Sequence, residues 1–156
     1  MSLSLDQRRA AAVLVLTLLS LMPAAAFANC RVSTTPLGFG NYDPGSPTPL
    51  DVAGEVTADC RGRSLSYSLS LSAGASGDAA DRYMTLATER LYYNIYLDAG
   101  RTIIWGDGLG PTSLVTGMMR RNGRQVDRHS FYGRVFPVQQ PSAGTYVDSM
   151  VVTILF

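Results

Sequence analysis

The sequence has no lysine, one histidine, one tryptophan and two cysteines, which leaves few residues for several kinds of site. A catalytic triad needs a base, and the neighbours of His129, Arg128 and Ser130, favour an exposed position before a strand. No cluster has metal-ligand spacing, and the glycines of residues 106–110 lack the strand–turn–helix context of a phosphate-binding loop. We therefore expect no catalytic residue, no metal site and no cofactor.

Residues 1–28 have the pattern of a secretory signal peptide. Arg8 and Arg9 form the basic region, residues 10–22 are an unbroken apolar run, and Ala26-Phe27-Ala28 is a small-residue cleavage site. The apolar run is too short for a comfortable membrane span, and no later stretch is long enough. The arginine pair raises the twin-arginine route, but its flanking residues do not support it. We expect export through Sec to the periplasm and a single mature domain at residues 29–156.

The sequence also has no large excess of positive or negative charge. The chain has 13 basic and 12 acidic residues; losing Arg8, Arg9 and Asp6 with the signal peptide leaves 11 of each. A balanced domain gives no reason to expect nucleic acid or an anionic membrane as a partner.

The two cysteines of the mature chain are Cys30 and Cys60. An even pair in an exported protein predicts a structural disulfide, because the compartment is oxidising. Closing a loop of this size stabilises a fold by roughly 3–4 kcal/mol in the chain-entropy model. A metal site or a redox pair would need closer spacing or further ligands.

Short segments with strand patterning alternate with turn residues along the whole mature chain. Leu65, Tyr67, Leu69 and Leu71 alternate most cleanly with serines, and Asn122-Gly123 is the strongest hairpin signal. No segment after residue 28 shows a helical period, so we expect an all-β sandwich. The expected strands are residues 31–42 (two short strands divided by a proline, the second around Leu37 and Phe39), 52–60, 64–72, 83–87, 91–97, 102–105, 112–119, 130–138 and 144–156.

The last expected strand, residues 144–156, is the most apolar and ends the sequence. One face is apolar except for Asp148, and the other is mixed. An apolar strand at a sheet edge invites pairing with another chain, so this strand is either central or covered by something else. The apolar face consists of Tyr146, Met150, Val152, Ile154 and Phe156.

Four arginines surround the Asn122-Gly123 turn: Arg120, Arg121, Arg124 and Arg128. They fit a solvated hairpin whose charges discourage edge pairing, which is the interpretation we favour. The alternative is a patch for an anionic surface or a polysaccharide.

The order of short motifs along the chain resembles that of the spore coat protein U domain, which is the fold of subunits in Csu-type archaic chaperone–usher pili. The matching segments are residues 36–44 (PLGFGNYDP), 56–60 (VTADC), 67–74 (YSLSLSAG), 91–96 (LYYNIY), 98–102 (DAGRT), 105–108 (WGDG), 132–134 (YGR), 144–148 (GTYVD) and 152–156 (VTILF).

This resemblance implies an incomplete immunoglobulin-like β-sandwich that lacks its final strand. A periplasmic pilus chaperone would lend a strand, and an outer-membrane usher would exchange it for the N-terminal segment of another pilus subunit. The groove would be bounded by Val147–Phe156 and by the first strand after Cys30. Polymerising relatives carry a donor segment before the first cysteine, whereas cleavage after Ala28 would leave only Asn29 there. We therefore expect a subunit that accepts a strand and belongs at the tip of a fibre.

Two other functions compete with this one. The same sandwich could act as a surface or coat protein that adheres to a surface or binds carbohydrate. A secreted hydrolase is the third alternative, and the single His129 and the lack of a metal motif argue against it. We expect a protein that is not an enzyme and that reaches the cell surface.

Overall fold

The computed structural model describes residues 28–120 and 122–156, so residues 1–27 of the predicted signal peptide lie outside the described part. No helix in the described part is long and apolar enough to cross a membrane. The elements are β1 (Asn29–Thr34), β2 (Leu50–Gly62), β3 (Leu65–Leu71), η1 (Gly74–Ser76), β4 (Tyr83–Leu86), β5 (Glu89–Tyr96), β6 (Ile104–Trp105), β7 (Thr112–Ser113), β8 (Val115–Met119), β9 (Gly123–Val135) and β10 (Val152–Leu155).

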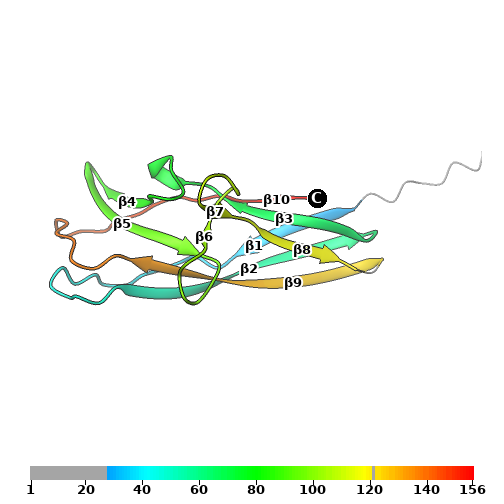
Figure 1. Ribbon diagram of the computed structural model, residues 1–156, viewed down its shortest axis with the longest axis horizontal. Coiled ribbons are helices and arrows are strands. Elements are labelled where there is room, and N and C mark those ends of the chain that lie inside the picture. Colours follow the sequence, from blue (N-terminus) through cyan, green and yellow to red (C-terminus); the bar gives the residue numbers. More distant parts are fainter. Residues whose placement is uncertain (1–27, 121) are drawn as a thin grey trace, which may run out of the picture.

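Two sheets face each other, which confirms the expected all-β class and the immunoglobulin-like sandwich (Figure 1). The larger sheet has the order β1-β2-β9-β5-β6-β7, with β4 also paired to β5, and the smaller sheet has the order β10-β3-β8. All pairs are antiparallel except β6 with β7. Consequently β1 ends one sheet and β10 ends the other.

The core lies between the sheets and follows the period-two pattern of the sequence. Tyr67, Leu69 and Leu71 of β3 are at most 4% exposed, as the alternation predicted. Across the interior, Trp105 of β6 packs on Phe131 of β9 with ring centroids 5.4 Å apart. Apolar burial of this kind is the main favourable contribution to folding.

The disulfide prediction is confirmed. Cys30 and Cys60 are directly opposite each other on β1 and β2, and their sulfur atoms are bonded. The bond therefore fastens the first strand of the domain to the long strand β2.

Strand β9 extends further than the expected strand at residues 130–138, beginning at Gly123 and ending at Val135. It pairs with β2 along its whole length, from Leu50 opposite Val135 to Gly62 opposite Gly123. The first half of β9 is polar on both faces, so it lacks the apolar alternation by which a strand is recognised.

The interpretation of Asn122-Gly123 as a β-hairpin is wrong. The turn is present, and Gly123 has a φ of 121°, which favours glycine. However, it joins β8 of the small sheet to β9 of the large sheet, and these strands do not pair. The same residues serve a crossover between sheets as readily as a hairpin, so the local signal could not decide between them.

The expected strand around Leu37 and Phe39 is also absent, because residues 35–49 are irregular. Both side chains instead pack over Gly133 of β9, where a Cβ atom would lie 2.5 Å from Leu37 Cδ2 and 2.8 Å from Phe39 Cζ. Side-chain packing into this notch, rather than a hydrogen-bonded ladder, holds the segment in place.

Candidate functional site

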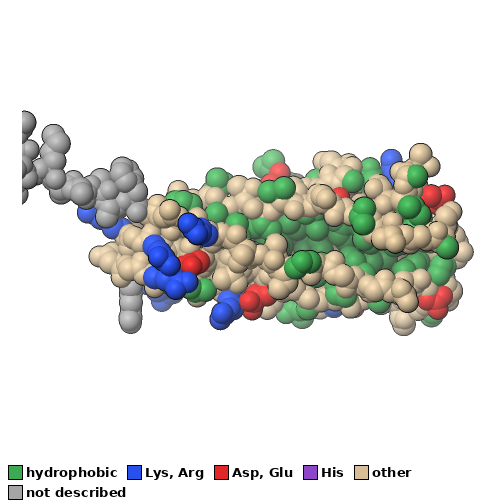
Figure 2. Space-filling view, turned by 180° about the vertical axis from the view of Figure 1, so that it is seen from behind, with side chains coloured by type: hydrophobic (Ala, Val, Ile, Leu, Met, Phe, Trp, Pro, Cys, Tyr) green, Lys and Arg blue, Asp and Glu red, His purple; other side chains and the backbone are tan. Residues whose placement is uncertain are grey.

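A long apolar groove runs along the side of the molecule where the edge strands β1 and β10 face each other. The two strands are neighbours there but do not pair. Figure 2 shows this side, with hydrophobic side chains gathered in a hollow along the long axis. No strand among the described residues pairs with the outer edge of either β1 or β10. The backbone groups along both edges are therefore available to another strand.

The first side of the groove is formed by β1 and the irregular segment that follows it. Val32, Leu37, Phe39 and Tyr42 are half-buried against the core. Phe39 meets Tyr93 of β5 edge to face, with ring centroids 5.7 Å apart, which fixes the orientation of this side.

The second side is the C-terminal segment, where the alternation expected from the sequence is present. Tyr146, Met150, Val152 and Ile154 are half-buried against the core, whereas Val151 and Leu155 point outward and are 63% and 61% exposed. Phe156, the fifth residue predicted for the groove, is 57% exposed at the end of the chain. The assignment of these five residues to a strand-binding groove remains a prediction.

The expectation of one continuous strand over residues 144–156 is wrong, since β10 covers only Val152–Leu155. Earlier in the segment, Val147 forms an isolated bridge with Thr85 of β4. Between them, Asp148 turns its carboxylate inward and accepts hydrogen bonds from the hydroxyl of Tyr93 at 2.6 Å and from the backbone N–H of Ala75 at 2.8 Å. These side-chain bonds replace the strand ladder there.

Asp148 also affects the chemistry of the groove floor. Burial raises the pKa of the Tyr93 hydroxyl well above its usual value, and the hydrogen bond to Asp148 raises it further. Tyr93 therefore stays protonated and acts as a donor that anchors the C-terminal segment. The alternation in the sequence shows Asp148 only as a break in an apolar face, and its partners Tyr93 and Ala75 are too distant in the sequence to be recognised.

Two hollows lie between the irregular segment that follows β1 and the segment that precedes β10. One has a volume of about 540 Å³ and lies between residues 37–44 and residues 141–146. The other, of about 150 Å³, reaches Met150 and Asp148. Leu37, Phe39 and Tyr146 line both, so the two hollows adjoin each other beside the half-buried apolar side chains of this side of the molecule.

The interpretation of His129 as an exposed residue before a strand is also wrong. His129 lies within β9 opposite Val56, is half-buried, and its Nε2 atom is 2.9 Å from the hydroxyl of Tyr67. That hydroxyl also donates to Asp127 Oδ2 at 2.8 Å. Burial raises the pKa of Tyr67 far above its usual value, with a further contribution from Asp127, so Tyr67 is a poor nucleophile and serves as a tie between the sheets.

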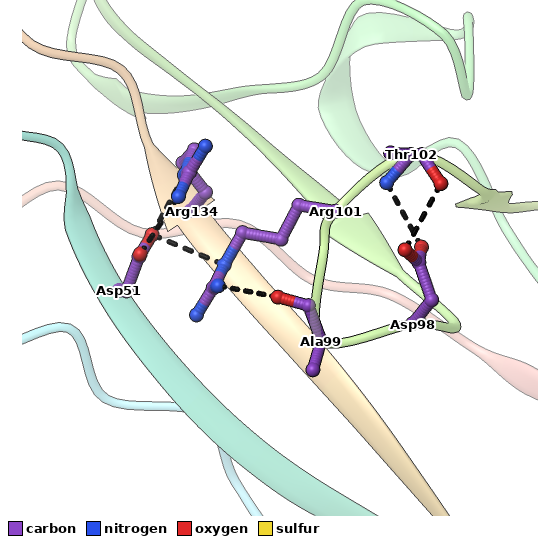
Figure 3. A network of polar contacts seen from close by, with 6 residues as sticks. All are labelled: Asp51, Asp98, Ala99, Arg101, Thr102 and Arg134. Atoms are coloured by element: carbon purple, nitrogen blue, oxygen red, sulfur yellow. Dashed lines mark hydrogen bonds and ion pairs between the residues drawn. The ribbon is translucent and has the colours of Figure 1, made fainter.

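A network of charged residues holds a loop onto the outer face of the large sheet (Figure 3). Arg134 donates two hydrogen bonds of 2.8 Å to Asp51, and the Nε atom of Arg101 lies 3.1 Å from the same carboxylate as an ion pair. Asp98 accepts hydrogen bonds from the backbone N–H groups of Thr102 and Ile103. The guanidinium of Arg134 lowers the pKa of Asp51, and the backbone N–H of Ile103 is the main cause that lowers the pKa of Asp98.

No group of three or more histidine, cysteine, aspartate or glutamate side chains suited to a metal ion occurs within residues 28–120 and 122–156. Within the described residues, the groove combines half-buried apolar side chains with the unpaired backbone edges of two strands, so it is the candidate site for a further strand.

Comparison with known proteins gives three findings. The profile of the Spore Coat Protein U domain family matches residues 15–153. The chain is 33% identical over 132 residues to Protein U of Myxococcus xanthus, covering 77% of this chain and 71% of that protein. A chain in the crystal structure of the CsuC–CsuE chaperone–tip adhesion subunit pre-assembly complex from the archaic chaperone–usher Csu pili of Acinetobacter baumannii has a TM-score of 0.55 at 22% identity. That match covers 83% of the present chain but 40% of the other chain, so the likeness concerns the fold.

Proposed function

The chain belongs to the Spore Coat Protein U domain family, and on that premise we propose that it is a secreted structural subunit of a chaperone–usher pilus. The observation that carries the proposal is the pair of open edges, β1 and β10, with half-buried apolar side chains between them. A strand from another chain would complete the sandwich there.

The mechanism is the addition of a β-strand to an exposed sheet edge. Main-chain hydrogen bonds to β10 supply affinity, and alternate side chains of the incoming strand fill the apolar hollows. A periplasmic chaperone fills the groove first, and at the outer-membrane usher the N-terminal segment of another subunit replaces it. On the C-terminal side the residues that receive the strand are Tyr146, Met150, Val152, Ile154 and Phe156.

This proposal assigns the protein no catalytic residue, metal or cofactor. Its route is export through Sec with removal of residues 1–28, capture in the periplasm, and assembly on the cell surface. Without a chaperone, the groove would expose more apolar surface than a soluble monomer normally carries. The chain expressed alone should then aggregate, be degraded or pair with itself, and a sharply melting monomer at high concentration would argue for a self-contained core.

A charge introduced into the groove tests the proposal directly. Replacing the half-buried Ile154 with Asp places a carboxylate without a partner in an apolar groove, which costs several kcal/mol. We expect Ile154→Asp to abolish co-purification with the periplasmic chaperone. Leu155→Asp is the matched control, since Leu155 is 61% exposed on the opposite face. Equal capture of both variants would contradict the proposed groove.

We also propose a position at the fibre tip. Cleavage after Ala28 would leave Asn29 alone before Cys30, too little for a donor strand, so the subunit would be exported first and sit at the end away from the cell. Immunogold labelling should then mark one end of each fibre, and a donor segment from a polymerising relative fused before Cys30 should move the label into the shaft. Labelling of the unmodified protein along whole fibres would contradict the tip position.

A second candidate function is adhesion to a surface or a carbohydrate. It is favoured by the arginines gathered at the end of the molecule where β1 begins (Figures 1 and 2). This function is compatible with a pilus subunit, because the groove and that end of the sandwich use different residues.

A further inference from the structure

One end of the sandwich concentrates positive charge, and we call it the arginine pole. It is formed by the start of β1, the connection from β2 to β3 and the connection from β8 to β9. Figure 2 shows basic side chains, in blue, gathered at this end of the molecule. All of them are arginines, because the sequence has no lysine. The described arginines of the pole are Arg31, Arg61, Arg63, Arg120 and Arg124.

The charge of the pole is only partly neutralised. Arg124 forms a bidentate pair with Asp59, with distances of 2.9 and 2.8 Å. Arg31, Arg61 and Arg63 are exposed and form no ion pair with any residue in the described ranges, and the same holds for Arg120. The domain as a whole is balanced, so this excess is a local separation of charge that attracts anions.

A shallow open depression of about 790 Å³ lies beside the pole, on the outer face of the small sheet. Arg120 lines it together with the hydroxyl groups of Ser66, Ser68 and Thr116, the side-chain amide of Gln125 and one carboxylate, that of Asp127, which accepts hydrogen bonds from Tyr67 and Gln125. Next to these polar groups are two apolar side chains, Met118 and Leu155, which are 53% and 61% exposed. Hydroxyl groups beside exposed apolar atoms suit the alternating polar and apolar surface of a sugar ring.

The depression has fixed walls. The amide of Gln125 donates to the backbone oxygen of Met118 at 3.0 Å and to Asp127, and its oxygen accepts from the backbone N–H of Arg120 at 3.1 Å. Asp127 in turn accepts from Tyr67. These bonds join β8 to β9, so the hydroxyl groups and Arg120 are presented from an ordered surface, which reduces the entropy lost on binding.

We propose that the arginine pole and this depression bind an acidic polysaccharide, whose carboxylate or sulfate groups pair with the arginines while its rings lie across the hydroxyl-lined floor. The depression is open and shallow, as suits a polymer that crosses it. A single-stranded nucleic acid is less well matched, because its bases stack on exposed aromatic side chains and the aromatic residue lining the depression, Tyr67, is 4% exposed. The inference depends on the fold and not on the donor-strand proposal.

The probe is heparin, a polysaccharide with both sulfate and carboxylate groups, and neutral dextran is the negative control. The exported protein, purified from periplasm with whatever strand fills its groove, should bind heparin and not dextran, with affinity that falls steeply as salt rises. Arg120→Gln and Arg63→Gln should each raise Kd about threefold to fivefold, as expected for one exposed charge contact. Arg90→Gln is the matched control, because Arg90 is an exposed arginine on β5, outside the pole.

Ser68→Val separates polysaccharide recognition from charge attraction alone, since it keeps every arginine. We expect it to weaken heparin binding without changing the salt dependence. Binding of double-stranded DNA as tight as that of heparin, or equal losses in Arg90→Gln and Arg120→Gln, would overturn the inference. Chaperone co-purification measured on the same variants reports separately on the donor-strand proposal, because the arginine variants should keep it.

Discussion

At the scale of single residues, Arg82 is the side chain whose environment is least expected from the sequence. It is fully buried, yet its guanidinium has no carboxylate partner among the described residues. It donates instead to the backbone oxygen atoms of Trp105 at 2.8 Å and Ser72 at 2.9 Å, and to Asn94 Oδ1 at 2.7 Å. Burial lowers the pKa of Arg82, and these acceptors compensate for the lost hydration.

Replacing Arg82 with Met should therefore destabilise the fold strongly. The variant would leave several buried carbonyl groups without a donor, and we expect a loss of about 3 kcal/mol in the free energy of unfolding. Arg63→Met, at an exposed arginine, should change it by less than about 0.5 kcal/mol. The measurement is urea unfolding of the strand-complemented protein, followed by the fluorescence of its single tryptophan, Trp105. Similar midpoints for the two variants would show that the network is dispensable.

Gly133 is the residue that allows one side of the groove to close onto the core. A Cβ atom there would overlap Leu37 and Phe39, whereas a Cβ atom at Gly38 would meet nothing within 4 Å. Gly133→Ala should displace Leu37 and Phe39, destabilise the domain by roughly 1–3 kcal/mol and weaken capture by the chaperone. Gly38→Ala should leave both unchanged in thermal unfolding and co-purification assays. Normal capture of Gly133→Ala would mean that this side of the groove plays no part in binding.

At the scale of elements, the pair formed by β2 and β9 organises the large sheet. Its outer face carries ion pairs between the two strands at Asp51 with Arg134, Glu55 with Arg128 and Asp59 with Arg124. The side chains of Asp51 and Asp59 are less exposed than that of Glu55. Of the three carboxylates, Asp51 alone also pairs with an arginine, Arg101, from the loop after β5. This pairing links the sheet to that loop.

The stability that Asp51 provides should depend on pH. Since its pKa is lower in the folded chain than in the unfolded chain, the contribution is complete above the unfolded value of about 4. This contribution to stability is lost as the pH falls below about 4 and through the lower pKa that Asp51 has in the folded chain. Asp51→Asn should thus lower stability at neutral pH by roughly 1 kcal/mol and flatten the acid limb of the stability profile.

The matched control for that experiment is Asp81→Asn, because Asp81 forms no ion pair with any residue in the described part of the chain. Denaturant unfolding between pH 2.5 and 7 compares the two variants. An acid limb as steep in Asp51→Asn as in the unmodified protein would assign the pH dependence to other groups.

Elements with a single strong pattern could be predicted from the sequence, and those shaped by tertiary contacts could not. The alternation in β3 gave its inward face correctly, because one side is serine and the other apolar. The polar half of β9 was missed, since its inward residues are held by hydrogen bonds such as that between Tyr67 and Asp127. The predicted terminal strand is longer than β10, because nothing local reveals that Asp148 reaches Tyr93.

The groove shows the same division. Its C-terminal side follows from period two in residues 146–156, and four of the five predicted side chains pack against the core. The opposite side was not predictable as a strand, because Leu37 and Phe39 owe their positions to a glycine nearly one hundred residues later in the chain. No pattern in residues 35–49 indicates that the missing side chain of Gly133 leaves space for Leu37 and Phe39.

At the scale of the whole molecule, the sandwich is elongated and carries the two proposed binding surfaces at separate places. The apolar groove runs along its length between β1 and β10, and the arginine pole lies at one end (Figure 2). A strand seated in the groove would join both sheets along one side and leave the depression beside β8 open. Assembly and surface contact can therefore occur in the same molecule.

The central claim, that a strand from another chain completes the sandwich, is tested most directly by hydrogen–deuterium exchange. The captured protein is compared with protein pulse-labelled just after release from its partner. We expect peptides covering β1 and β10 to exchange slower in the captured protein, by a factor on the order of ten or more, while the arginine pole around residues 61–64 and 120–124 is unchanged. Unchanged exchange in both edge strands, or protection confined to the pole, would contradict the account.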